Sequence, residues 1–262
     1  MSHAIDVTRP HVARMYNWLL GGKDNYVVDR QAARILLQLV PNYGELVRSN
    51  KRFLWRVVRL LAEQHGVKQF LDHGVGLPAQ VNVHQIVQQV DSNARVVYID
   101  NDPMVLAHGR ALLEENDETA VIEADVADTE AIFGHCEVQR LIDFERPVAA
   151  LFVSVLHCLP DRADPVGMVR RVARRLAPGS FVVVCQLTSE DAQVRSQVTE
   201  FMRGCVGTWG RVRRRCEVAA CFDGMDVLAP GLVEVSSWRP GPGESVPASH
   251  ACQEYGGVGM VR

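Results

Sequence analysis

Two stretches decide the fold: Gln-Phe-Leu-Asp-His-Gly-Val-Gly-Leu-Pro at 69–78 and Arg-Val-Val-Tyr-Ile-Asp-Asn-Asp-Pro at 95–103. Each contains a short apolar run that reaches an acidic residue, and the first run continues into a glycine turn. Glycine adopts positive φ and has no Cβ, so such a turn at a strand end lets bare backbone approach a ligand. An acid that ends the next strand can accept hydrogen bonds from ribose hydroxyls. The two stretches therefore predict a fold that binds a nucleoside cofactor.

The glycine turn is compatible with two cofactors. Gly74 and Gly76 fit a dinucleotide fingerprint, because Ala79 completes the pattern Gly-x-Gly-x-x-Ala. The carboxylate of Asp72 would repel a pyrophosphate, but it suits the amino-acid tail of S-adenosylmethionine (SAM). Pro78 has no N–H to donate to a phosphate. We therefore expect SAM, and an NAD(P)-dependent oxidoreductase is the alternative.

Apolar runs alternate with helical patterns along most of the chain. We expect strands over 69–71, 96–99, 120–123, 148–153 and 181–184, and helices over about 80–90, 103–115, 128–134 and 164–176. This alternation predicts an α/β fold with a mostly parallel sheet. After residue 185 the alternation weakens, and we expect helices over 190–205 and 216–222 and strands over 232–238 and 257–261.

The N-terminal segment has a different pattern from the rest. Apolar residues recur at helical spacing over 11–20, between Asp29 and Pro41, and over 45–65, and Gly66 follows the third of these stretches. We expect residues 1–65 to form a helical cap and residues 66–262 to form one α/β domain.

Acidic residues follow the second and third predicted strands. Asp100 lies 24 residues after Gly76, close to the ~20 expected between a glycine turn and a ribose-binding acid. Asp102 fits a helix N-cap better, because Pro103 suits the first helical position. Asp125 can accept a hydrogen bond from an adenine amino group. The alternative is that Asp125 only stabilises a turn.

The fourth strand ends in Ser154-Val155-Leu-His157. Ligands of open α/β sheets bind beyond the carboxyl ends of the strands, so these residues are expected near the cofactor. A histidine with an ordinary pKa of ~6.5 can take a proton from a substrate. His157 is the first candidate for a general base and Tyr16 the second, although a lone histidine is more often a packed, hydrogen-bonded residue.

The composition limits the classes of protein that the chain can represent. The net charge is −3 in 262 residues, which argues against a dedicated nucleic-acid binder. None of the seven cysteines forms a Cys-x-x-Cys pair, and we predict no metal site. The N-terminus lacks the pattern of a signal peptide, and no apolar run reaches the ~20 residues that span a bilayer. We therefore expect a cytoplasmic protein without a membrane segment.

These motifs resemble those of the class I SAM-dependent methyltransferases. More narrowly, Arg-Met-Tyr-Asn-Trp-Leu-Leu-Gly-Gly-Lys-Asp-Asn-Tyr at 14–26, Asn-Lys-Arg-Phe-Leu at 50–54 and Asn-Val-His at 82–84 are similar to the S-adenosyl methyltransferase family, formerly catalogued as a domain of unknown function. The resemblance implies a Rossmann-like three-layer sandwich with seven strands and an antiparallel last strand. It also implies that SAM lies between the glycine turn and the N-terminal helices.

The resemblance assigns parts of the cofactor to residues of this chain. The methionine part would face the turn that begins at Asp72, the ribose would face Asp100, the adenine would face Asp125 and Val126, and the loop after Tyr16 would close the site. The predicted cofactor-binding residues are Tyr16, Gly21, Gly22, Lys23, Asp72, His73, Gly74, Gly76, Leu77, Asp100, Asn101, Asp125, Val126, Ser154 and Val155. His73 and Val75 depart from the family's Asp-Ile-Gly-Thr-Gly pattern.

The predicted function is methyl transfer from SAM to a small-molecule acceptor that the resemblance does not name. One alternative is a regulator that binds SAM or S-adenosylhomocysteine without catalysis. The other is the NAD(P)-dependent oxidoreductase.

Overall fold

The structure, a computed structural model, describes residues 5–207, 209–241, 243–244 and 251–262. Its centre is a sheet in which the strands of these residues follow the order β3-β2-β1-β4-β5-β8-β6, with β7 paired to β8 off this path. The parallel strands are β1 (Gln69–His73), β2 (Arg95–Asp100), β3 (Thr119–Glu123), β4 (Ala149–Val153) and β5 (Phe181–Thr188). The antiparallel strands are β8 (Gln253–Met260), β6 (Asp226–Val227) and β7 (Val233–Glu234). The predicted α/β fold is confirmed, including the antiparallel last strand, but the sheet of the described residues has eight strands where seven were expected.

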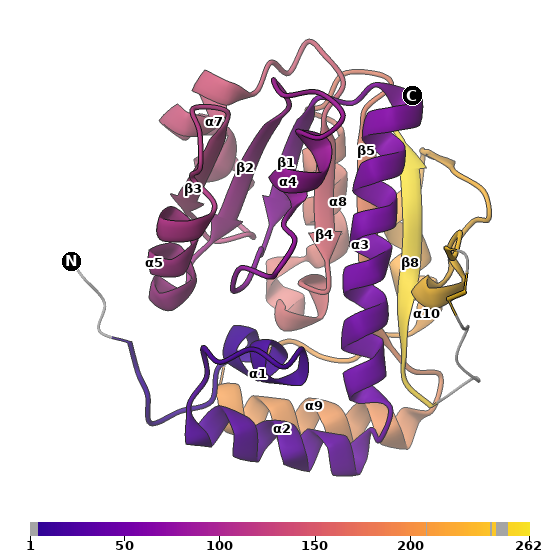
Figure 1. The fold of residues 1–262 in the computed structure, drawn as a ribbon. Coiled ribbons are helices and arrows are strands. Elements are labelled where there is room, and N and C mark those ends of the chain that lie inside the picture. The colour runs from indigo at the N-terminus through magenta and orange to yellow at the C-terminus, as the bar shows by residue number, and fades with distance from the viewer. Residues whose placement is uncertain (1–4, 208, 242, 245–250) are drawn as a thin grey trace.

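Helices cover both faces of the sheet (Figure 1). Phe70 and Val96 point to one face, and the next residues along each strand, Leu71 and Val97, point to the other, so each strand feeds two buried clusters. The first face is covered by α3 (Tyr43–His65), α4 (Val83–Val87) and α5 (Pro103–Leu112). The second is covered by α6 (Thr129–Gly134), α7 (Cys136–Leu141), α8 (Pro165–Ala173) and α10 (Arg215–Ala219). The result is a three-layer sandwich.

A further helical layer lies across the carboxyl edge of the sheet (Figure 1). It contains α1 (Val12–Leu19), α2 (Val27–Leu39) and, from the second half of the chain, α9 (Ala192–Val206). Their apolar residues form one cluster with the start of α3 and with Leu187 at the end of β5. The layer therefore closes the edge at which the parallel strands end.

One expected strand, 232–238, is wrong. The structure has the two-residue strand β7 there, followed by the 3₁₀ turn η4 (Val235–Ser237). The Glu234 carboxylate accepts a hydrogen bond from the Ser236 N–H at 3.1 Å, which favours a turn over an extended chain. Trp238 is buried edge-on against Phe53, with ring centroids 5.5 Å apart.

The remaining 3₁₀ turns are η1 (Leu156–Cys158), η2 (Asp161–Ala163) and η3 (Ala220–Phe222). None of the helices in the described ranges combines the length and apolar character of a bilayer crossing.

The pairing of β8 with β5 depends on a position without a side chain, which gives a stability prediction. A Cβ at Gly256 would lie 1.9 Å from the Val184 carbonyl oxygen, whereas a Cβ at Gly204 in α9 would meet nothing within 4 Å. Gly256→Ala is expected to lower the free energy of unfolding by about 1–3 kcal/mol or more. The control Gly204→Ala is expected to raise it by roughly 0.5–1 kcal/mol. Urea denaturation measures both, and equal effects of the two substitutions would contradict the packing described.

Candidate functional site

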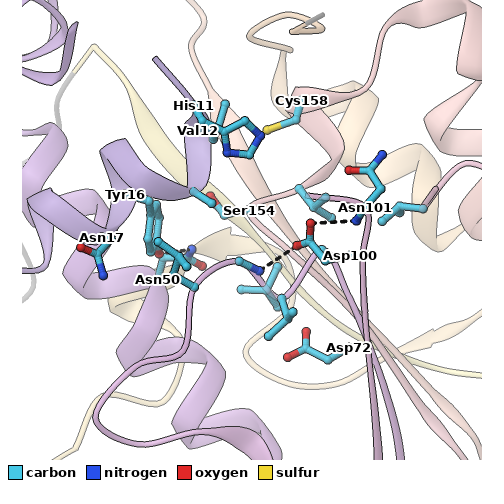
Figure 2. Close-up of a pocket in the computed structure, with 18 of the residues that line it drawn as sticks. His11, Val12, Tyr16, Asn17, Asn50, Asp72, Asp100, Asn101, Ser154 and Cys158 are labelled. Carbon is cyan, nitrogen blue, oxygen red and sulfur yellow. Dashed lines mark hydrogen bonds between the residues drawn. The ribbon is translucent and has the colours of Figure 1, made fainter. Parts of the chain in front are cut away.

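A cavity of about 900 Å³ opens at the carboxyl edge of the sheet, beneath α1 (Figure 2). This volume lies within the range of small-molecule sites. Thirteen of the predicted cofactor-binding residues line it, namely Tyr16, Gly21, Gly22, Asp72, Gly74, Gly76, Leu77, Asp100, Asn101, Asp125, Val126, Ser154 and Val155. The structure thus brings together residues from α1, the glycine turn and the ends of four strands.

The glycine turn after β1 is tightly constrained. Gly74 has φ +73° and Gly76 has φ +66°, which is the left-handed region that disfavours side chains. A Cβ at Gly74 would lie 2.4 Å from Val155 Cγ2. The turn therefore presents backbone rather than side chains to the cavity.

The carboxylate of Asp100 binds this turn to the end of β2 (Figure 2). Its Oδ2 accepts a hydrogen bond from the Gly76 N–H at 3.0 Å, and its Oδ1 accepts from the N–H groups of Asn101 and Asp102 at 2.9 and 3.0 Å. Burial raises the pKa of Asp100, and the three amide donors oppose that rise. Asp102 is the N-cap of α5, as predicted. Its side chain accepts a hydrogen bond from the Met104 N–H at 2.9 Å.

A buried acid and a partly buried lysine interact in the cavity. Asp72 is 5% exposed, and its carboxylate takes part in none of the hydrogen bonds among the described residues. Burial raises the pKa of Asp72 to about 6, against the opposing effect of the Lys51 ammonium. Burial lowers the pKa of Lys51, whose Nζ lies 5.7 Å from the Tyr16 ring centroid. These residues offer an anion and a cation to a ligand that carries both charges.

The α1 wall is held by hydrogen bonds to α3. Asn50 Nδ2 donates to the Tyr16 hydroxyl at 2.7 Å, and that hydroxyl donates to the Val47 carbonyl at 3.2 Å. Burial raises the pKa of Tyr16 well above its ordinary value. The phenol therefore stays protonated, and this arrangement does not suit the base that Tyr16 was predicted to be.

The end of β4 connects the cavity to a buried acid. Ser154 has φ +60°, and its hydroxyl donates to Glu254 Oε1 at 3.0 Å. Glu254 lies on β8 and is 1% exposed. The strand order places β5 between β4 and β8, so this bond spans two sheet positions.

Three predicted residues do not line the cavity. His157 is buried, and its Nδ1 accepts a hydrogen bond from the Leu187 N–H at 3.1 Å. Burial and then the Arg213 guanidinium lower the pKa of His157 to about 3, so this ring is a packed hydrogen-bond acceptor and not the expected base. His73 stacks on Phe152 with centroids 4.2 Å apart, on the β1 face that lies away from the cavity. Lys23 is exposed and does not line the cavity.

Sequence reasoning missed several residues of the site. Lys51 stands in the family-like segment 50–54, but nothing local in that segment indicates that it faces Asp72 across a cavity. Glu254 is a hundred residues from Ser154 and comes from an antiparallel strand, so no sequence motif connects them. Trp209 in the wall follows α9, which no local pattern placed near the cofactor.

The basic cluster 211–215 serves the structure of the neighbouring loop. Arg211 pairs with Asp161 at 2.8 Å and with Glu217 at 2.5 Å. The buried Arg213 donates to the carbonyl of Leu156 at 2.8 Å and also pairs with Asp161. These arginines hold η1 and η2 at the cavity rim.

The whole chain, residues 1–262, matches the model of the S-adenosyl methyltransferase family. The chain belongs to this family. It is therefore a SAM-dependent methyltransferase, as predicted, and its cofactor is SAM.

Solved structures agree with this membership. The methyltransferase is similar to a proposed methyltransferase from Thermobifida fusca YX, at 38% identity and a TM-score of 0.89, covering 98% of this chain and 97% of the other. It is also similar to a DUF574 family protein from Streptomyces avermitilis MA-4680, at 32% identity and a TM-score of 0.91, covering 99% and 100%. The mitomycin 7-O-methyltransferase MmcR, at 17% identity, a TM-score of 0.50 and coverage of 94% and 67%, shares the fold alone. A comparison with curated proteins gives no match.

The buried imidazole of His73 predicts a pH-dependent stability effect. Within the described ranges neither ring nitrogen has a hydrogen-bond partner, and burial lowers the pKa of His73 to about 4 from an ordinary 6.5. The unfolded chain therefore binds a proton more readily, and this residue costs stability as the pH falls from 6.5 towards 4.

His73→Leu is expected to stabilise the methyltransferase, and the gain is expected to grow by about 2 kcal/mol between pH 7 and pH 5. Denaturant titrations at both pH values measure this difference. The contribution of His157 to the pH dependence cancels, because His157 is present in both proteins. A gain that is the same at pH 7 and pH 5 would contradict the burial of an uncharged imidazole.

Proposed function

We propose that the cavity binds SAM with its amino-acid tail at Asp72 and Lys51 and its ribose at Asp100, for methyl transfer to a small molecule. The observation that carries the proposal is the 3.0 Å hydrogen bond from the Gly76 N–H to Asp100. This bond joins the side-chain-free turn to the acid that we propose binds the ribose. The fit to the cofactor is supported by the cradle at Gly74, which a Cβ would fill.

The amino-acid tail of SAM carries an ammonium and a carboxylate, which complement the buried pair described above. Asp72 would accept hydrogen bonds from the ammonium, and Lys51 would donate to the carboxylate. Each buried charge would gain a partner, which lowers the cost of keeping it out of water. The pair thus selects a zwitterion over a phosphate.

The adenosine end is matched by polar groups at the ends of β2 and β3. Asp100 retains about one acceptor site for a ribose hydroxyl, because a carboxylate offers about four lone-pair sites and three accept from backbone amides. Asp125 uses Oδ1 to accept from the Ala127 N–H at 2.9 Å, which leaves its other oxygen for an adenine amino group. Val126, 7% exposed, would contact the ring.

SAM supplies a methyl group on a positively charged sulfur, which makes that carbon electrophilic. The task of the residues is to hold a nucleophile in line with the methyl and to exclude water, which can contribute ~7–11 kcal/mol at best. Residues of α1 and the end of α9 form part of the cavity wall, and the layer that they make with α2 lies across this edge of the sheet (Figure 1). This position suits the layer to exclude water.

The composition of the rest of the cavity wall favours a small and partly apolar acceptor. Its residues on the far side from the glycine turn are mainly apolar or aromatic, and they include Leu20, Cys158, Leu159, Val206 and Trp209. The cavity is bounded by packed helices, so it suits a discrete molecule better than a polymer strand. Arg162 at the rim offers one positive charge.

A dinucleotide fits the site less well. A pyrophosphate is usually held at the N-terminus of the helix that follows the glycine turn. Here α4 begins only at Val83, and its N-cap Asn82 is occupied by a hydrogen bond from the Ala79 N–H at 3.0 Å. The carboxylate of Asp72 would also face the phosphates.

We also propose that the methyltransferase acts in the cytoplasm. The support is the state of its seven cysteines, all of which lie in the described residues as free thiols.

Calorimetric titration with SAM, S-adenosylhomocysteine and NADH tests the proposed function. We expect both sulfur compounds to bind and NADH not to bind, and we expect methyl transfer from isotope-labelled SAM to a member of a panel of phenols, alcohols and amines. Binding of NADH without binding of SAM would contradict the proposal.

The pH dependence of S-adenosylhomocysteine binding tests the role of Asp72. The affinity of the unmodified protein is expected to fall as the pH drops from 7 to 5, because Asp72, with a pKa of about 6, loses its charge. Asp72→Asn is expected to bind about 10–100-fold more weakly at pH 7, with little dependence on pH. The control Asp128→Asn, at an exposed N-cap outside the cavity, is expected to bind like the unmodified protein. An unchanged pH dependence in Asp72→Asn would refute this assignment.

A further inference from the structure

A carboxylic acid lies directly behind the cavity wall, within reach of one hydroxyl. Ser154 lines the cavity (Figure 2), and its Oγ donates to Glu254 Oε1 at 3.0 Å. Glu254 is 1% exposed, and its second oxygen, Oε2, has no hydrogen-bond partner among the residues that the structure describes. The Ser154 hydroxyl therefore connects the cavity to a buried acid.

No cation neutralises this acid in the described part of the chain. The titratable groups that face it are the phenols of Tyr16 and Tyr43, the thiols of Cys158, Cys185 and Cys252, and the carboxyl of Glu234. Burial raises the pKa of Glu254 to about 8, while the Ser154 hydroxyl and the Cys185 thiol oppose the rise. A carboxyl in such surroundings is protonated at pH 7 until a positive charge arrives.

The backbone of Ser154 has a conformation that serine rarely adopts. Its φ of +60° is typical of glycine, and its N–H donates to the Cys185 carbonyl at 2.9 Å. A residue in this region costs of order 1 kcal/mol or more, and such residues cluster at functional sites. Glycine would remove the strain but also the hydroxyl, which is the group that joins the cavity to Glu254.

Three other titratable groups of the cavity already have partners or a proposed role. The Tyr16 hydroxyl is hydrogen-bonded to α3, and Asp100 is bound to three backbone amides. Asp72 faces Lys51 at the end assigned to the amino-acid tail. The pair of Ser154 and Glu254 is a route by which a proton could leave the acceptor without reaching water. His11 also lines the cavity, but its Nε2 lies 3.3 Å from the Asp102 carboxylate.

We propose that Glu254 receives, through the Ser154 hydroxyl, the proton that the acceptor loses on methylation, and that the acceptor is a phenol, alcohol or amine. This inference rests on the proposed binding of SAM in the cavity. In this proposal Ser154 contacts the acceptor, and Glu254 holds the proton.

The step is balanced in atoms and charge. The acceptor's oxygen or nitrogen forms a bond to the methyl carbon as the carbon–sulfur bond breaks, and the bonding pair stays on sulfur. The acceptor proton moves to Ser154 Oγ, and the Ser154 hydroxyl proton moves to Glu254 Oε1. Before the step the site holds a sulfonium and a carboxylate, and after it both are neutral. The buried site thus keeps the same net charge throughout, which avoids the large cost of an unpaired buried charge.

The charge on the cofactor should therefore control the protonation of Glu254 before any acceptor is present. Binding of cationic SAM favours the ionised form and releases a proton at pH 7. Binding of S-adenosylhomocysteine, whose sulfur is uncharged, leaves Glu254 protonated.

Calorimetry in two buffers of different ionisation enthalpy counts the protons released on binding. At pH 7 we expect SAM to release a substantial fraction of one proton more than S-adenosylhomocysteine does. In Glu254→Gln, which cannot ionise, the two ligands are expected to release equal amounts, while the exposed control Glu63→Gln is expected to keep the difference. Equal release in the unmodified protein, or a difference that survives in Glu254→Gln, would overturn the proposal.

A second variant keeps the test decisive if Glu254→Gln does not fold. Ser154→Ala removes the hydrogen bond that favours the ionised carboxylate. SAM releases more protons than S-adenosylhomocysteine does, and the pH at which this difference reaches half its maximum is expected to rise in Ser154→Ala. An unchanged midpoint would count against proton transfer through Ser154. Failure of both ligands to bind any of the folded proteins would instead reject the proposed SAM site, so the two failures are distinguishable.

Discussion

The carboxylate of Asp100 accepts hydrogen bonds from three backbone amides, and one of these, the Gly76 N–H, belongs to the turn after a different strand. Parallel pairing of β1 with β2 brings the two strand ends together, and the carboxylate then sets the path of the turn. The close approach of Gly74 to Val155 constrains the same turn from the β4 side. The cavity, its backbone-lined wall and the position of Asp72 all follow from this arrangement.

The cavity separates two kinds of buried charge. At one end Asp72 and Lys51 form an acid–base pair that complements a zwitterion. At the other end Glu254 lies behind Ser154 with no cation beside it in the described residues, which suits it to hold a proton rather than a permanent charge. A cationic cofactor placed between them would interact favourably with both carboxylates. The electrostatics of the site are therefore matched to a ligand whose charge changes during the reaction.

Sequence patterns predicted the fold and much of the cavity wall, because strand ends and glycine turns are encoded locally. Asp100 is an example, since its distance from the glycine turn is set by one strand–helix–strand unit. His157 shows the limit of such reasoning: it follows the right strand, but the 3₁₀ turn η1 directs its ring towards Leu187. Lys51 and Glu254 could not be predicted, because their roles depend on helix packing and on an antiparallel strand added late in the chain.

A crystal structure of the methyltransferase with S-adenosylhomocysteine tests the central claim most directly. The account predicts that the ribose hydroxyls lie within hydrogen-bond distance of the Asp100 carboxylate, that the backbone of Gly74 and Gly76 contacts the ligand, and that the ammonium faces Asp72. Electron density for the adenosine away from Asp100, with the glycine turn uncontacted, would contradict the account.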